Sequence, residues 1–375
     1  MKKLLSTLVS LFIFLQGYAQ IEKTEAEITE IMKKLDAVGL AVAVVKDNQL
    51  IYSHSFGKKS IENNTMLSNT DIFRIASISK SFAATSIMQL VDAKRISLDD
   101  DFSDLVGFKV RNPKYPETVI TLKMILSHTS SVNDSEGYFN LDVINPTKNV
   151  NWAKCYTDKK PGTGYLYCNL NFNMVGAVIE KMSGQRYDNY VKQHILTPLN
   201  LYGGYCIDSL DSQRFASLYE YENQSFKLAT AAYAPRREEL SNYKLGYSTP
   251  VLSPTGGMKI SATDLAKYMM MHMNYGKVGA VKIISKKSSK QMQTALSKDE
   301  NYGLALLNTD QMIDGIALTG HTGSAYGLYS AMFFDPKNKF GFVMITNGAD
   351  GKMEKDFRMI TRETLRVLYQ NFIKN

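Results

Sequence analysis

The sequence has few of the residues and motifs on which several common classes of enzyme site depend. Its five histidines are scattered, and neither H-E-x-x-H nor any other zinc-ligand spacing occurs. There is no glycine-rich phosphate loop and no G-x-S-x-G nucleophile elbow. Three cysteines, Cys155, Cys168 and Cys206, are too few for a disulfide scaffold, although one pair could form. We therefore expect neither a metal ion nor another cofactor.

Internal repeats, low-complexity tracts and charge blocks are also missing. The formal net charge is +8, but no basic stripe with interleaved aromatic residues occurs, so nucleic acid is not an expected partner. A solvated basic surface explains this charge most simply, although it could also favour anionic substrates. The 375 residues are 44% hydrophobic and 21% charged, which is typical of a globular protein with a large core.

The first 20 residues have the pattern of a secretory signal peptide. Lys2 and Lys3 precede an apolar run over residues 4–15, which is too short for a membrane span, and small residues follow at Gly17 and Ala19. Removal of this segment would lower the formal charge from +8 to +6, because it holds two lysines and no acids. We expect an exported protein, periplasmic or secreted, without a membrane span.

Strand patterns lie at both ends of the remaining chain, and helix patterns lie between them. Strands are expected at residues 38–45, 49–56, 316–318, 327–335 and 340–347, and a closing helix at 353–373. The most economical arrangement is an α/β (α+β) fold in which both termini build one antiparallel sheet with flanking helices. We predict a single catalytic unit over residues 21–375. Its sheet region would cover about 21–72 and 300–375, and an inserted all-helical region would cover about 73–299.

Ser77 and Lys80 form a Ser-x-x-Lys pair at the start of an apolar helix within residues 73–98. The same spacing occurs at Ser55 and at Ser241, so the spacing alone is weak evidence. At Ser77, however, the helix is apolar nearly all round, which predicts burial. Burial lowers the pKa of a lysine and lets it accept a proton near neutral pH. The alternative is a capping serine with a lysine that reaches out to solvent.

Two further segments carry candidate site residues. Tyr167 and Asn169 lie between a Pro-Gly turn and a helix, and a tyrosine beside a cationic lysine can have a lowered pKa and transfer protons. His321, Thr322 and Gly323 form the only segment in which a basic residue precedes Thr-Gly. In isolation, the first segment could be a core tyrosine with a turn asparagine, and the second a simple turn. The backbone N–H near Ala325 could join that of Ser77 in an oxyanion hole.

Together and in this order, these segments resemble the serine β-lactamase and penicillin-binding protein superfamily, in particular its class C β-lactamase, D,D-peptidase and esterase branch. The resemblance covers nearly all of the chain after residue 20. It rests on FRIASISKSF, ITLKMILSHTSS, PGTGYLYCNLNFNMVGAVIEKMSG, SPTGGMKISATDLAKYM, NYGLAL and GHTGSAYGLYSAMFFDP.

The resemblance implies a β-lactamase-like fold with its site in a cleft between the sheet and the helical region. Ser77 would be the acylated nucleophile, and Lys80 and Tyr167 would transfer protons together. Asn169 would bind the substrate or Lys80. His321 and Thr322 would line the substrate side of a sheet strand, at positions where relatives often have Lys and Thr. Histidine is mostly neutral at pH 7, which disfavours an efficient β-lactamase.

We therefore expect a serine hydrolase that acts on small esters or amides through an acyl-enzyme at Ser77. The acyl group could pass to water or to an alcohol or amine acceptor, and the 22 tyrosines and 17 phenylalanines could line an apolar acceptor pocket. A β-lactamase or D-Ala-D-Ala carboxypeptidase is the alternative among enzymes. A non-catalytic protein that binds cell-wall peptides is the alternative from another class.

Overall fold

The computed structural model describes residues 19–297 and 299–374. The predicted signal peptide lies outside the described residues except for its last two positions, so it stays a prediction. These two positions belong to a helix over residues 19–34. No helix in the described part of the chain is long and apolar enough to cross a membrane.

Both ends of the chain build one antiparallel sheet, as predicted. Its strand order is β11-β12-β13-β14-β1-β2-β3. The N-terminal strand β1 lies against the C-terminal strand β14, in register from Leu40 opposite Thr346 to Lys46 opposite Phe340. The strands are β1 (Gly39–Lys46), β2 (Gln49–Ser60), β3 (Thr65–Met66), β11 (Leu307–Thr309), β12 (Leu318–Ala325), β13 (Leu328–Asp335) and β14 (Phe340–Thr346).

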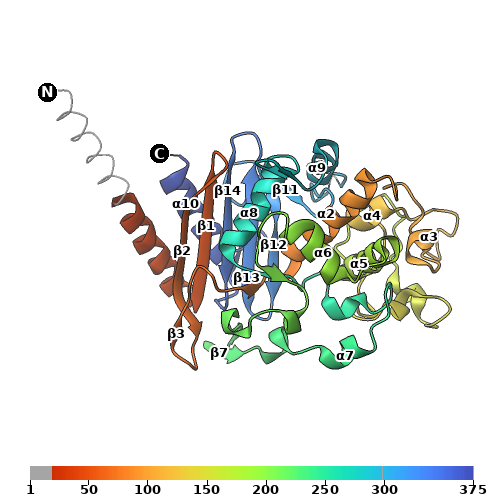
Figure 1. The fold of residues 1–375 in the computed structure, drawn as a ribbon, viewed down its shortest axis with the longest axis horizontal. Helices are drawn as coiled ribbons and strands as arrows, with labels where there is room; N and C mark the ends of the chain where they lie inside the picture. The colour runs from red at the N-terminus through yellow and green to blue at the C-terminus, as the bar shows by residue number, and fades with distance from the viewer. Residues whose placement is uncertain (1–18, 298, 375) are drawn as a thin grey trace.

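Alternating side chains of the sheet enter two separate cores. On β1, Ala41, Ala43 and Val45 belong to the large core that includes α8 (Ala262–Met273) and the helical region. The intervening residues of β1 belong to a second core with the helix over residues 19–34 and α10 (Met359–Phe372). Figure 1 shows these two helices on one face of the sheet and α8 on the other. The buried strands are apolar on both faces because both faces are covered.

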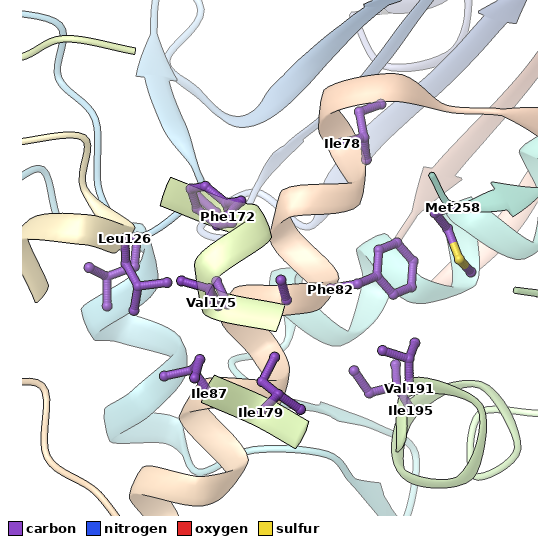
Figure 2. Close-up of a cluster of buried hydrophobic side chains, with 14 of the residues drawn as sticks. Ile78, Phe82, Ile87, Leu126, Phe172, Val175, Ile179, Val191, Ile195 and Met258 are labelled. Atoms are coloured by element: carbon purple, nitrogen blue, oxygen red, sulfur yellow. The ribbon is translucent and has the colours of Figure 1, made fainter. Parts of the chain in front are cut away.

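Helix α2 (Ser79–Asp92) runs through the middle of the helical region. Its side chains are buried nearly all round, as its composition predicts. Figure 2 shows Phe82 and Ile87 of α2 near Val175 and Ile179 of α5. The other helices of this region are α3 (Phe102–Val106), α4 (Leu122–Leu126), α5 (Asn169–Ser183), α6 (Tyr187–Val191), α7 (Arg237–Ser241) and α9 (Lys286–Gln293).

The inserted region also contains short strands, which the sequence did not predict. They form a three-stranded sheet and two hairpins: β4 (Phe73–Arg74), β8 (Lys259–Ile260) and β5 (Gly203–Gly204); β6 (Tyr219–Glu222) with β7 (Ser225–Leu228); and β9 (Lys277–Val278) with β10 (Val281–Lys282). Most of these strands are only two residues long, so they have no periodicity to detect. The region is therefore mainly, and not entirely, helical.

Three boundaries also differ from the prediction. The strand expected at residues 316–318 is β12, which begins only at Leu318 and continues to Ala325. Strand β2 continues beyond Gly57, which has a φ of +71° and lies opposite Gly39, so this glycine changes the path of the strand without ending it. The closing helix begins only at Met359, because residues 353–358 form a small hairpin of β15 (Met353–Glu354) and β16 (Phe357–Arg358).

Candidate active site

Ser77 lies in a 3-10 turn, η1 (Ala76–Ile78), just before α2 begins. Ala76 has a φ of +46°, a left-handed conformation that is strained for a residue with a Cβ. Such outliers concentrate at functional sites. Because α2 begins at Ser79, the prediction that Ser77 belongs to the regular helix was wrong by two residues. Ser77 and Lys80 are nevertheless in contact. The Nζ atom of Lys80 lies 3.1 Å from Ser77 Oγ.

Lys80 is fully buried and is held by neutral oxygen atoms. Its Nζ donates to Asn169 Oδ1 and to the carbonyl oxygen of Thr255, each at 2.9 Å. Burial lowers the pKa of Lys80 to about 7, in spite of the opposing attraction of Asp134. A neutral amine has two N–H bonds and one lone pair. With its two N–H bonds directed at Asn169 and Thr255, the lone pair is left for the Ser77 hydroxyl.

Asp134 fixes the orientation of Asn169. Its carboxylate accepts the backbone N–H of Asn169 at 2.8 Å and the side-chain amide N–H at 2.9 Å. It also accepts the backbone N–H of Leu170, so it caps the N-terminus of α5 in place of the preceding residue, Cys168. With its NH₂ group bound to Asp134, Asn169 must turn its oxygen toward Lys80.

Tyr167 is half-buried beside both residues of the pair. Its ring centroid lies 4.7 Å from Lys80 Nζ. Burial raises the pKa of Tyr167, and a hydrogen bond with the Ser77 side chain opposes this only in part. The expectation of a lowered tyrosine pKa was therefore wrong, because desolvation of the phenolate outweighs the groups that would stabilise it. At neutral pH Tyr167 is a phenol that can donate a proton.

The predicted segment around His321 lies on β12 and faces the nucleophile. Strand β11 pairs only with Leu318–Gly320, so β12 from His321 to Ala325 extends beyond it. A Cβ atom at Gly323 would lie 2.3 Å from the carbonyl oxygen of Ile75 and 2.4 Å from Ser330 Oγ. Only glycine lets the strand approach the turn of Ser77 so closely. Over this part β12 is a local edge, although β11 is the edge strand of the sheet.

His321 is buried and uncharged at neutral pH. Its Nε2 lies 3.0 Å from the hydroxyl of Tyr302. Burial, and to a smaller extent the nearby Lys80, lower its pKa to about 4. His321 therefore offers a substrate a neutral polar contact and no fixed positive charge.

These residues meet at one cleft of about 610 Å³. Lys80 lies buried behind Ser77, and Gly323 packs against the turn. The predicted residues that line the cleft are Ser77, Tyr167, Asn169, His321, Thr322 and Ala325. Arg74, Thr255 and Tyr326 also line it and were missed by sequence reasoning, as was Asp134. Arg74, Thr255 and Tyr326 lie within three of the segments that carry the resemblance, but no spacing marked them as site residues, and Asp134 lies outside those segments.

Cys168 is not a second nucleophile, and the described residues form no metal site. All three cysteines are free and buried. Burial, and next the charge of Asp134, raise the pKa of Cys168 well above its usual value, so it is a thiol and not a nucleophile. Within residues 19–297 and 299–374, no group of three or more His, Cys, Asp or Glu residues is arranged to hold a metal ion.

Comparison with known proteins agrees with this arrangement. The chain is 23% identical over 327 residues to Protein flp of Staphylococcus aureus, which covers 82% of this chain but only 59% of that protein. An octameric penicillin-binding protein homologue from Pyrococcus abyssi matches with a TM-score of 0.73 and 25% identity, over 93% of this chain and 77% of that one. EstCE1, a hydrolase with promiscuous acyltransferase activity, matches with a TM-score of 0.72 and 18% identity, over 94% and 100% of the two chains.

The family model described as Beta-lactamase matches residues 24–364, which is most of the chain and includes every residue of the cleft. Since sequence and fold agree, this chain belongs to the Beta-lactamase family.

Proposed function

We propose that this protein is an exported hydrolase that acts on small esters or amides through an acyl-enzyme at Ser77. The proposal rests on the hydrogen bonds of Lys80. Two acceptors at 2.9 Å occupy the N–H bonds of the neutral amine, so its lone pair faces Ser77 Oγ at 3.1 Å. This is the arrangement that a general base needs.

In the proposed acylation step, Ser77 Oγ attacks the substrate carbonyl carbon while its proton passes to Lys80 Nζ. The backbone N–H groups of Ser77 and Ala325 would stabilise the developing oxyanion. The Tyr167 phenol would give its proton to the leaving oxygen or nitrogen, and the proton on Lys80 would restore it. Hydrolysis then needs a water molecule that attacks the Ser77 ester and returns the proton to the serine.

The acyl group could also pass to an alcohol or amine, because an acyl-enzyme reacts with whichever nucleophile is held best. The open, partly aromatic cleft supports this possibility, since Tyr138 and Tyr326 form part of its wall. The similarity in fold to EstCE1, itself described as a hydrolase with promiscuous acyltransferase activity, is consistent with it. We include transfer to a small alcohol in the proposal.

A β-lactamase or D-Ala-D-Ala carboxypeptidase is the second candidate, favoured by the likeness to a penicillin-binding protein homologue. The neutral state of His321 argues against it, because β12 then presents no permanent cation to a substrate carboxylate. A non-catalytic peptide-binding protein would have no need for a lysine beside Ser77 whose pKa is lowered to about 7.

Three substrates separate these functions. Mature protein is incubated with p-nitrophenyl butyrate, with the same ester plus increasing methanol, and with a fluorescent penicillin, alongside Ser77→Ala. We expect ester hydrolysis, formation of methyl butyrate that rises with methanol, and no penicillin turnover, with all activity lost in the variant. Rapid penicillin turnover without ester cleavage would establish the second candidate instead. No reaction with either probe would contradict the acyl-enzyme.

A further inference from the structure

Two basic residues lie opposite each other in the small sheet beside the cleft. Arg74 on β4 pairs directly with Lys259 on β8. Both are buried, with 8% and 5% of their surface exposed. Like charges directly opposite each other destabilise an antiparallel pair, and buried charges are normally neutralised. This pair therefore destabilises the folded protein. Its position beside the cleft of Ser77 points to a role in binding a ligand.

The partners of both residues are neutral. Arg74 Nε donates to the carbonyl oxygen of Gly256 at 2.9 Å, and Lys259 Nζ donates to that of Tyr205 at 2.6 Å. Among residues 19–297 and 299–374, neither forms an ion pair with a carboxylate. Burial, and next the charge of Arg74, lower the pKa of Lys259 well below its usual value. A bound anion would offset both effects.

Arg74 and Lys259 line a second cavity of about 370 Å³. This cavity shares Arg74, Phe139, Ser253 and Tyr326 with the cleft of Ser77, so the two spaces adjoin. Apolar residues such as Ile207, Ala232 and Leu252 form part of its remaining wall. The cavity therefore combines an apolar wall with basic groups close to the nucleophile.

The carboxylate among the described residues that line this cavity is already engaged. Glu239 lies 2.9 Å from Arg236, which also lines the cavity. This ion pair leaves Arg74 and Lys259 uncompensated. A ligand that enters from the cleft would therefore meet the Arg74 guanidinium and the Lys259 amine, neither of which a lining carboxylate occupies.

We infer that this second cavity binds a carboxylate at the far end of the substrate's acyl group. The inference rests on the proposed acyl-enzyme at Ser77. The leaving group must take its proton from Tyr167 or Lys80, and neither of these lines the second cavity. The part of the substrate that reaches past Arg74 into the second cavity is therefore its acyl group. The substrate class is the monoester or monoamide of an aliphatic dicarboxylic acid.

Turnover of matched esters tests this inference. The p-nitrophenyl monoesters of succinic to suberic acid are compared with the same compounds capped as methyl esters. At one chain length at least, we expect kcat/KM to favour the free carboxylate by about tenfold or more, which is the effect of roughly 1.4 kcal/mol of charge-assisted binding. A ratio of one or below at every length, with good turnover of the methyl esters, would overturn the inference and leave the proposed function intact.

Substitutions at Lys259 assign the effect to this cavity. Lys259→Met should bring the ratio close to one, and Lys259→Gln should do the same while it can still donate to the Tyr205 carbonyl. The second variant separates loss of charge from loss of folding, which melting curves of both monitor. Lys277→Met, on the exposed end of β9, should keep the ratio. Unchanged selectivity in both folded Lys259 variants would contradict the assignment.

Direct binding keeps the test independent of turnover. Calorimetry with Ser77→Ala should detect binding of adipate or suberate that is weaker for the monomethyl ester and is lost when Lys259→Gln is added. This result would support carboxylate binding in the second cavity even if wild-type protein cleaved no ester. In that case only the proposed function would fail. If the acid and the ester bound equally, or if neither bound, the inference that the second cavity binds a carboxylate would be overturned.

Discussion

The carboxylate of Asp134 holds both the backbone and the side-chain N–H of Asn169, at 2.8 and 2.9 Å. One residue therefore caps α5 and turns the Asn169 oxygen toward Lys80. Because that oxygen occupies one N–H bond of the amine, Asp134 helps to determine where the lone pair of Lys80 points. The helix terminus and the proton acceptor of the site depend on the same side chain.

Substitution of Asp134 by alanine should reduce both stability and activity. The loss of a helix cap and of charge-assisted hydrogen bonds is expected to cost about 2–4 kcal/mol of unfolding free energy. Ester kcat/KM should fall by at least about tenfold, because a freed Asn169 amide can present its NH₂ group to Lys80. Urea unfolding and ester kinetics measure the two effects. Asp158→Ala, whose carboxylate is exposed and pairs with Lys114, should change neither.

The pH dependence of acylation should report the state of Lys80. Its pKa is lowered to about 7, so the amine gains a proton below this pH and loses the lone pair that accepts the Ser77 proton. We therefore expect kcat/KM for a neutral ester to rise with pH, with an inflection near 7. His321, with a pKa of about 4, should add no inflection between pH 5 and 8. A flat profile from pH 5 to 9 would show that Lys80 is not the base.

Tyr167→Phe should keep the fold and lose at least about 100-fold in kcat, the lower end for a general acid–base group. Only the hydroxyl group is removed, so packing of the ring beside Lys80 is retained. Tyr165→Phe is the matched control, because Tyr165 is a neighbouring tyrosine whose ring packs on His128 and Tyr302. Wild-type turnover in Tyr167→Phe would exclude this hydroxyl from proton transfer.

Gly323→Ala should separate β12 from the turn that holds Ser77. The new Cβ would meet the Ile75 carbonyl at 2.3 Å and Ser330 Oγ at 2.4 Å, so backbone must move. We expect a loss of about 1–3 kcal/mol in stability, as for other overpacked sites, and a larger proportional loss of activity. In Gly204→Ala the nearest atom, Leu210 Cδ2, lies at 3.7 Å, and stability should be nearly unchanged. A fully active Gly323→Ala would show that the close approach is not needed.

The sequence predicted the parts of the fold and site that local patterns determine. The apolar, β-branched content of β1 and β14 located the sheet, and the apolar surface of α2 predicted the burial of Lys80. Contacts between distant segments were not predictable in the same way. Asp134 lies in a polar loop 35 positions before Asn169, with nothing in its neighbours to mark it.

The pKa values of the site residues were also not predictable from the sequence, because they depend on how strongly burial opposes nearby charges. The sequence places Tyr167 near Lys80 but does not show which group keeps its charge. The structure shows Lys80 fully buried and Tyr167 half-buried, and desolvation raises the pKa of Tyr167 and lowers that of Lys80. Arg74 was overlooked for a similar reason, since the two-residue strand that pairs it with Lys259 leaves no pattern in the sequence.

The position of the covalent adduct tests the central claim most directly. The protein is treated with a fluorophosphonate, and the intact mass and the modified peptide are determined. We predict one adduct, on Ser77, that is lost in Ser77→Ala. It should remain in Ser55→Ala and Ser241→Ala. Ser55 and Ser241 are the two other serines with a lysine three residues later, and their hydroxyls donate to Asn69 and to the carbonyl of Glu238. No adduct, or an adduct on another residue that persists in Ser77→Ala, would contradict the account.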